Sequence, residues 1–296
     1  MSALQTPRRK ILRKRDSFTK PDHSVLIVCG WFAKARRLSQ SLQPVIMSRL
    51  RHFLSRALPQ RYKLLYFIHR KARRRQRPVE KLVLRLLCGK DKTAIDVGAN
   101  IGTISYYLSR YCRENHAFEI NPQIADKLRR AKLANTKVYE IGLSDSRRSA
   151  FLRVPLAGFG PVFGNATIEA ANDLDGRAIA MQELPVAMLD DFGLQDVGII
   201  KIDVEGHELA VLRGAVKTLE RDRPSLIIEI VERMNGQAFA EINRLTSGLA
   251  YGCYRLVGSM MVPASSIEDK RGDNDFYFLQ PSVVQAINSR LRANQA

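Results

Sequence analysis

A chain of 296 residues, 45% of them hydrophobic, is long enough for one α/β domain with a sizeable core and an additional segment. Its net charge of +19 is unevenly distributed. The first 80 residues hold 21 Lys and Arg against three acids, whereas the remainder holds 27 against 26. Enzymes that act on nucleic acid usually carry basic charge around the active cleft, so the nearly neutral body argues against that class.

The cysteines and apolar runs point to the cell interior. Cys29, Cys88, Cys112 and Cys253 lie far apart with no CxxC pair, so neither a zinc site nor a disulfide framework is indicated. The longest apolar run, Ser24–Ala33, has ten residues, whereas a bilayer span needs about 20. No clean signal-peptide cleavage site follows it. We therefore expect a cytoplasmic protein that does not span a membrane.

Residues 1–80 are predicted to form a basic extension, partly disordered or helical, ahead of a domain at 81–296. Residues 44–70 mix apolar and basic side chains at roughly helical spacing, and the basic run Lys71–Arg77 follows. Three interpretations remain open. The extension is a set of charged helices covering the domain, a surface that binds anionic lipid or another polyanion, or a targeting address.

From about Glu80 onward, apolar strand patterns alternate with helical ones. Helices are expected at 79–88, 104–112, 123–135 and 207–222, and strands at 92–98, 114–119, 137–145, 150–156, 199–206 and 225–232. Such alternation is typical of a mostly parallel sheet with helices on both faces. Residues 254–262 and 273–280 read as two further strands joined too closely for a crossover helix. This predicts an antiparallel edge hairpin.

Acidic residues recur where these strands end, which is where ligands bind in sheets of this kind. They are Asp96, Glu119, Asp145, Asp203 and Glu229. The first turn has glycines spaced GxxxG, at Gly98 and Gly102, rather than the GxGxxG of a dinucleotide site. A carboxylate facing such a turn suits a cationic amino-acid group better than a pyrophosphate, and Glu119 is placed to accept ribose hydroxyls. The combination favours S-adenosylmethionine over NAD.

Several motifs in this order resemble the FkbM family of S-adenosylmethionine-dependent methyltransferases. They are "IDVGANIG", "AFEINP", "GLSD", "LDDF", "IIKIDVEGHELAVLRGA" and "RPSLIIEI", spread over Lys92–Ile230, and "DNDFYFL" fits the last strand of the family. Residues 1–80 lie outside the resemblance. The resemblance implies a Rossmann-like class I methyltransferase fold with a mostly parallel seven-stranded sheet.

The resemblance also implies roles for individual residues. The methionine part of the cofactor would be held by Asp96, Gly98, Asn100 and Gly102, the ribose by Glu119, and the adenine by Ser144 and Asp145. Asp203 and Glu205 would line the floor where the methyl group is transferred. Family members resemble O-methyltransferases acting on sugar or polyketide hydroxyls. The expected acceptor is therefore a small molecule, a glycan or a lipid-linked saccharide.

Transfer to a hydroxyl is an in-line displacement that is helped by a base. The candidate catalytic residues are Asp203, Glu205 and His207, although His207 equally suits a plain helix start. Asn165 and Thr167, in the glycine-rich segment 158–168, and Glu229 are the candidate substrate-binding residues. That segment is either a lid or acceptor platform, or a long surface connection. No ligand spacing favours a metal at Asp203 and Glu229, so none is expected.

Three other functions compete with this interpretation. An RNA methyltransferase could use the basic extension, but the chain lacks the Asn/Asp-Pro-Pro-aromatic motif and a Pro-Cys pair. A catalytically silent scaffold with the same fold would not need the acids and glycines to be intact. An NAD-dependent oxidoreductase would need a second, closer glycine. The oligomeric state is not predicted.

Overall fold

The computed structural model describes residues 60–75, 78–158, 160–170, 172, 174, 176–230, 236–266 and 274–294. The chain divides into two compact units, Met1–Leu58 and Pro59–Ala296. The first unit, with the expectations for its basic and apolar runs, lies outside the described residues. Among the helices that are described, none is long and apolar enough to cross a membrane.

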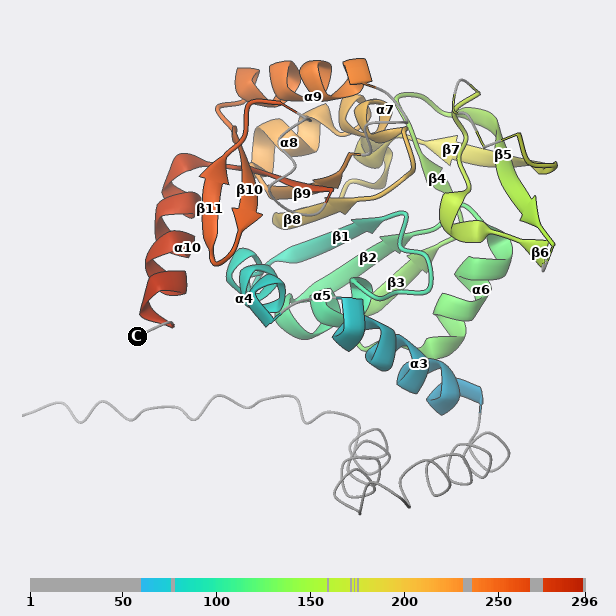
Figure 1. Cartoon of the computed structure of the whole chain (residues 1–296), viewed down its shortest axis with the longest axis horizontal. Coiled ribbons are helices and arrows are strands. Elements are labelled where there is room, and N and C mark those ends of the chain that lie inside the picture. The colour runs from blue at the N-terminus through green and yellow to red at the C-terminus, as the bar shows by residue number, and fades with distance from the viewer. Residues whose placement is uncertain are drawn as a thin grey trace, which may run out of the picture. The chain divides into compact units, whose positions relative to one another are not determined.

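The core of the second unit is an eight-stranded sheet in the order β11-β10-β12-β9-β8-β1-β2-β3 (Figure 1). Strands β3, β2, β1, β8 and β9 are parallel, and β12 pairs antiparallel with both β9 and β10. The strands are β1 Thr93–Val97, β2 Glu114–Phe118, β3 Thr136–Tyr139, β8 Val197–Ile202, β9 Ser225–Glu229, β10 Gly252–Val257, β11 Met260–Pro263 and β12 Asp275–Leu279. The predicted parallel sheet and antiparallel edge are thus confirmed. The strand count exceeds seven because a turn at Gly258 folds residues 252–263 into a hairpin of their own.

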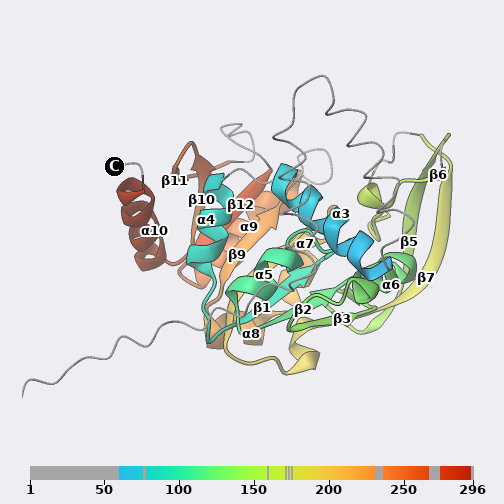
Figure 2. The ribbon, with the colours of Figure 1, turned by 90° about the horizontal axis from the view of Figure 1, so that it is seen from below.

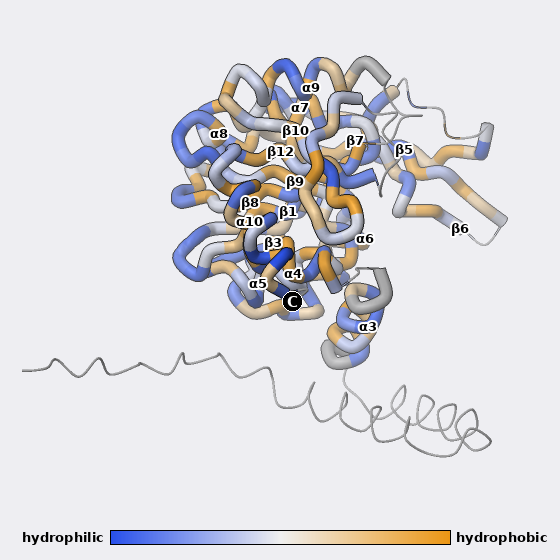
Figure 3. Tube along the Cα trace, turned by 60° about the vertical axis from the view of Figure 1, so that its left-hand side comes forward, coloured by the Kyte–Doolittle hydropathy of each residue, from blue (hydrophilic) through white to orange (hydrophobic). Residues whose placement is uncertain are grey.

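Helices cover both faces of this sheet (Figure 2). One face carries α3 Gln60–Arg75, α4 Pro78–Leu87, α5 Ser105–Tyr111 and α6 Pro122–Ala131, and the other carries α7 Glu208–Arg213, α8 Val216–Asp222 and α9 Gly236–Gly248. Helix α10, Pro281–Ala293, packs beside β11 and α4. Because both faces are covered, β1 is buried along its whole length and the central strands are apolar (Figure 3).

Helix α3 belongs to this compact unit, which begins at Pro59 rather than at the predicted boundary near residue 81. The apolar side chains Leu65, Ile68 and Ala72 are buried, although basic residues surround them in the sequence. Their burial, with α3 packed beside α5 and α6, explains why this part of the basic segment folds with the domain. The apolar face of α3 thus packs on the domain, and the binding of lipid or another polyanion by its basic residues stays a prediction.

The single helix predicted at 207–222 is wrong, since the chain forms two helices, α7 and α8, separated near Gly214. A Cβ atom on Gly214 would lie 1.9 Å from the backbone oxygen of Ser144. The backbone at Ser144 therefore packs directly against the backbone at Gly214. Helix α8 then begins afresh, and Asp190 of the short helix η2, Leu189–Phe192, accepts hydrogen bonds from the amides of Lys217 and Thr218. The helical spacing of apolar residues continues from α7 into α8, so the sequence pattern gives no sign of the break between them.

A second, four-stranded sheet was not predicted. Its order is β4-β7-β5-β6, with β4 Gly142–Leu143, β5 Arg148–Ala157, β6 Gly160–Pro161 and β7 Ile179–Ala187. The predicted strand at 137–145 is divided between the two sheets, because the chain leaves β3 at Tyr139 and enters β4 at Gly142. The segment between β5 and β7 contains the glycine-rich stretch with the short helix η1, Phe163–Asn165.

Replacing Gly98 by Ala should destabilise the domain by about 3 kcal/mol, combining strain at positive φ with overpacking. The φ of Gly98 is +74°, and a Cβ atom there would lie 1.8 Å from the backbone oxygen of Asp203. Gly164→Ala is the matched control, since a Cβ atom there meets open space. Urea unfolding of both variants checks the prediction, and equal midpoints would contradict it.

Candidate functional site

The carboxyl ends of β1, β2, β8 and β9 meet at one edge of the sheet, and four of the five predicted acids gather there. Asp96 is the second-last residue of β1, and Glu229 is the last residue of β9. Glu119 directly follows β2, and Asp203 directly follows β8. Asp203 is close enough to raise the pKa values of the other three carboxyls. Asp145 is the exception, because it is exposed and follows β4 in the second sheet.

Asp96 is buried at the floor of the β1 turn, with 2% of its surface exposed. Its Oδ2 accepts a hydrogen bond of 2.5 Å from the hydroxyl of Ser105, the first residue of α5. Burial raises the pKa of Asp96 to about 6, and the neighbouring Asp203 acts in the same direction, while Ser105 and Lys201 oppose the shift. Ser105 was not predicted as a site residue.

The two glycines of the β1 turn make room for protein atoms. Gly98 faces the carbonyl oxygen of Asp203, and a Cβ atom on Gly102 would lie 2.4 Å from Leu128 Cδ1 in α6. The turn is fastened to the neighbouring strand because the amides of Gly98 and Ala99 both donate to the oxygen of Phe118. A side chain at either position would clash with protein atoms, and the predicted contact of this turn with a ligand stays a prediction.

Glu119 connects the β1 turn to the start of α6. Its Oε2 accepts from the amide of Asn100 at 2.7 Å, and its Oε1 accepts from the amide of Asn121 at 2.9 Å. Asn121 in turn caps α6 by accepting from two amides of the first turn. Burial raises the pKa of Glu119 to about 7, although the two amides oppose the shift. A bound hydroxyl would have to use the remaining lone pairs of this carboxylate.

His207 lies in a buried cluster that includes the predicted adenine-binding residue Ser144. Its Nδ1 pairs with the carboxylate of Glu169, and its Nε2 lies 2.9 Å from the hydroxyl oxygen of Ser144. Asp145 and Arg148 also contact that hydroxyl, at 3.2 and 3.3 Å. His207, a candidate base in the sequence, is therefore fully engaged with its neighbours, and it does not line the cavity beside Asp203.

The segment after β5 is fastened onto the turn that carries Glu205. Thr167 is 1% exposed, and its hydroxyl donates to the backbone oxygen of Glu205 at 2.8 Å. Asn172 Nδ2 donates to the same oxygen at 2.6 Å and packs under Gly206. Arg153 Nη1 also contacts the segment, because it donates to the backbone oxygens of Glu169, Ala170 and Asn172. Asn165, at the end of η1, is partly exposed.

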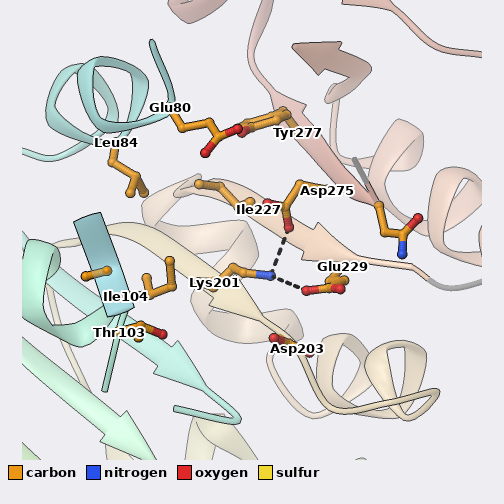
Figure 4. A pocket seen from close by; sticks show the side chains of 12 residues that line it. Glu80, Leu84, Thr103, Ile104, Lys201, Asp203, Ile227, Glu229, Asp275 and Tyr277 are labelled. Atoms are coloured by element: carbon orange, nitrogen blue, oxygen red, sulfur yellow. Dashed lines mark hydrogen bonds and ion pairs between the residues drawn. The ribbon is translucent and has the colours of Figure 1, made fainter. Parts of the chain in front are cut away.

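A cavity of about 340 Å³ opens between helices α3 and α4 and the ends of β8 and β9 (Figure 4). Its lining residues are Ala72, Glu80, Leu84, Thr103, Ile104, Lys201, Asp203, Ile227, Glu229, Asn274, Asp275 and Tyr277. The cavity thus brings Asp203 together with Glu229, as predicted from their places at strand ends. Lys201, Asp275 and Glu80 also line the cavity but were not predicted as site residues. A Lys inside the apolar strand "IIKI" was a signal for Lys201, because a buried charge needs partners.

Lys201 lines the cavity with a nearly buried side chain and contacts acidic neighbours. Its Nζ is 3.0 Å from Asp275 Oδ1, 3.9 Å from Glu229 Oε2, and 3.3 Å from the oxygen of Ile202. Burial alone would lower the pKa of Lys201, but Asp275, Asp203 and Glu229 together raise it. For Glu229, burial and then the adjacent Asp203 raise the pKa to about 8. Within the described part of the chain, no group of three His, Cys, Asp or Glu side chains is arranged to hold a metal ion.

Replacing His207 by Phe should loosen the segment after β5 without unfolding the domain. The change removes two buried hydrogen bonds, worth about 1 kcal/mol each, so amide hydrogen exchange in residues 163–170 should be about 30-fold faster. His116→Phe, which alters another buried His beside Tyr139, is the control and should leave that segment unchanged. Unaltered exchange in the His207 variant would show that the segment is held by other contacts.

Comparison with known proteins places these features in a family. The model of the methyltransferase FkbM domain matches residues 96–253, a little over half of the chain. The methyltransferase sdnD of Sordaria araneosa is 30% identical over 156 residues, which cover 40% of this chain and 59% of that protein. The hexuronic acid methyltransferase AglP of Haloferax volcanii is 30% identical over 175 residues, covering 57% of this chain and 68% of AglP.

Among solved structures, an FkbM methyltransferase from Methylobacillus flagellatus KT aligns over 86% of this chain and 60% of its own length. The identity is 16% and the TM-score 0.44, so this alignment adds nothing to the topology described above. The family model covers the β1 turn, Glu119, the Asp203 turn and β9 in a single match. This chain therefore belongs to the FkbM methyltransferase family.

Proposed function

We propose that this protein transfers the methyl group of S-adenosylmethionine to a hydroxyl of a sugar, a lipid-linked saccharide or a polyketide-like small molecule. The observation that carries the proposal is the gathering of the buried carboxyls Asp96 and Glu119 with the partly exposed carboxyl of Asp203 at one sheet edge. Burial and the charge of Asp203 raise the pKa values of Asp96 and Glu119, whereas the charge of Lys201 opposes the shift at Asp96. A ligand bearing a sulfonium and an ammonium group supplies the missing positive charge.

The roles proposed for individual residues follow from where each lies. Asp96 and the turn that contains Asn100 would hold the amino-acid part of the cofactor. Glu119 would accept the ribose hydroxyls while keeping its two backbone partners. Ser144 and Asp145 would contact the adenine, with His207 fixing the position of Ser144. When bound, the cofactor supplies a methyl group on a positively charged sulfur, which is the electrophile of the reaction.

The cavity below α3 and α4 is the proposed acceptor site. It adjoins the β1 turn through Thr103 and Ile104, and Asp203 and Glu229 lie at its floor. These carboxyls would accept the proton that the acceptor hydroxyl loses, and Lys201 would keep them in place. Leu84, Ile104 and Ile227 form an apolar wall that excludes water from the reacting atoms. A sugar acceptor also agrees with the substrate named for AglP.

The cellular setting remains part of this proposal. Residues 1–80, with 21 basic and three acidic side chains, would bring the enzyme to an anionic membrane surface inside the cell. Contact with such a surface would fit a lipid-linked acceptor. The near-neutral body makes nucleic acid the less suitable partner for the same charge.

Calorimetric titration with S-adenosylmethionine, S-adenosylhomocysteine and NAD tests the cofactor. We expect micromolar binding of the first two ligands and none of NAD. Asp96→Asn and Glu119→Gln should each weaken binding by about 1.5–3 kcal/mol through a lost charge-assisted contact. Asp126→Asn, a partly exposed acid of α6 paired with Arg130, is the control and should bind like the parent protein. Unchanged affinity in both site variants would place the cofactor elsewhere, and no binding at all would favour the scaffold.

The rate of methyl transfer should rise with pH up to and through about 8. Glu229 must lose its proton before the pair with Asp203 can accept one, and the pKa of Glu229 is about 8. In Glu229→Gln this limb of the profile should disappear, together with a lowered rate. Formation of S-adenosylhomocysteine between pH 6 and 9.5 provides the measurement. A variant that keeps the same pH limb would exclude Glu229 as its origin.

A further inference from the structure

We propose that Cys88 and Cys112 form a redox-active pair, which a small peroxide converts into a reversible disulfide between the ends of α4 and α5. The two residues are 24 positions apart in the sequence and lack the spacing of a CxxC motif, so only the fold brings them together. Both are free thiols in the structure. This modification site stands apart from the proposed methyl transfer, because neither cysteine lines the cavity.

Each cysteine stands at the carboxyl end of a helix. Cys88 directly follows α4, and its amide donates to the backbone oxygen of Leu84 at 3.0 Å. Cys112 directly follows α5, and its amide donates to the backbone oxygen of Leu108 at 2.9 Å. Helices α4 and α5 also pack against each other, and the thiol of Cys88 is hydrogen-bonded to the sulfur of Cys112. The two sulfur atoms are therefore neighbours, as a disulfide requires.

Three hydrogen bonds hold the turn after Cys88 against the end of α5, on both sides of Cys112. They run from Lys90 Nζ to the backbone oxygen of Arg110 at 2.9 Å, from Arg113 Nη1 to that of Asp91 at 2.8 Å, and from the amide of Arg113 to that of Lys92 at 2.8 Å. The position of Cys112 beside Cys88 is thus fixed by the surrounding chain as well as by the contact between the thiols.

The surroundings of the two sulfur atoms make Cys112 the thiol that ionises first. The hydrogen bond from Cys88 lowers the pKa of Cys112, and the amide of Gly89 and the charge of Lys90 act in the same direction, although burial opposes the shift. The same hydrogen bond, together with burial, raises the pKa of Cys88. Because the thiolate is the reactive form of cysteine, Cys112 is the residue that attacks an oxidant, while Cys88 keeps its proton.

Oxidation of the pair by hydrogen peroxide takes place in two steps. The Cys112 thiolate attacks one peroxide oxygen, the O–O bond breaks, and the departing hydroxide takes up the proton that Cys112 had released. The sulfur of Cys88 then attacks the sulfenic acid on Cys112, so that the S–S bond forms and the S–O bond breaks. The second hydroxide leaves as water with the proton of Cys88. Two thiols and one peroxide give one disulfide and two water molecules, and an external dithiol reverses the reaction.

The exposure of the cysteines decides which oxidant fits and which thiol serves as the reference. Cys112 is 4% exposed and Cys88 is partly exposed, so a small peroxide suits the pair better than a bulky disulfide. Cys253 is also nearly buried, at 8% exposed, but burial raises its pKa to about 12. It is therefore a matched internal control, with similar access and an unreactive thiol.

Peptide mass spectrometry of the full-length protein after treatment with hydrogen peroxide tests the pair. Trypsin releases Cys88 in "LLCGK" and Cys112 in "YCR". We expect these two peptides to appear joined and two hydrogen atoms lighter than their sum, and to separate again in dithiothreitol. Cys253 should keep its free thiol under the same conditions.

Two variants separate the roles of the cysteines, and a melting experiment tests the fit of the bond. In Cys88→Ser, peroxide should stop at a sulfenic acid on Cys112, which dimedone traps. In Cys112→Ala, dimedone should label Cys88 at least about tenfold more slowly. The disulfide should raise the melting temperature of the parent protein by at least about 3 °C, because it closes a loop without displacing either helix. Peroxide should give no such rise in Cys88→Ser.

Absence of the joined peptides after oxidation would overturn the proposal, and so would equal oxidation of Cys253. Joined peptides with an unchanged or lower melting temperature would show that the native packing does not accommodate the bond, which also contradicts it. None of these measurements uses the cofactor or a methyl acceptor, so their outcome is independent of the calorimetric test of the proposed function.

Discussion

The interlocking of two turns at the carboxyl edge of the sheet is the constraint on which this site depends. The oxygen of Asp203 occupies the space where any other residue at position 98 would carry its Cβ atom. That contact holds the turn after β1 against the turn after β8, and Glu119 extends the arrangement to β2 through the amide of Asn100. Three strand ends are thereby kept in register, and their acids are kept together.

Holding these acids together is unfavourable in the isolated protein. Carboxyls that are buried near one another resist ionisation, which is seen in the raised pKa values of Asp96, Glu119 and Glu229. The charge of Lys201 offsets part of this repulsion at Asp96 and Glu229, and hydrogen bonds from Ser105 and two amides also stabilise the ionised carboxyls. A cationic ligand bound at this cluster, as proposed for S-adenosylmethionine, would relieve the repulsion that folding imposes.

The sequence predicted the parallel sheet, the antiparallel edge and the acids at strand ends, because apolar periodicity and strand order are local or nearly local signals. It did not predict the break at Gly214 or the second sheet. The first depends on the backbone of Ser144, 70 residues earlier, and the second on pairing of β7 with both β4 and β5. The contacts of His207 with Glu169 and Ser144 were likewise not predicted, because these partners lie 38 and 63 residues away in the sequence.

The proposed acceptor cavity is lined by residues from inside and outside the range that the FkbM model matches. Its floor, with Lys201, Asp203 and Glu229, lies within the stretch that matches the FkbM model, whereas Glu80, Leu84, Asp275 and Tyr277 lie before or after it. Substitutions at Glu80, Leu84, Asp275 or Tyr277 would therefore change the walls of the proposed acceptor site and leave Asp203 and Glu229 in place. With this arrangement, the same methyl-transfer reaction could serve different acceptors if only the lining residues outside the matched range differed.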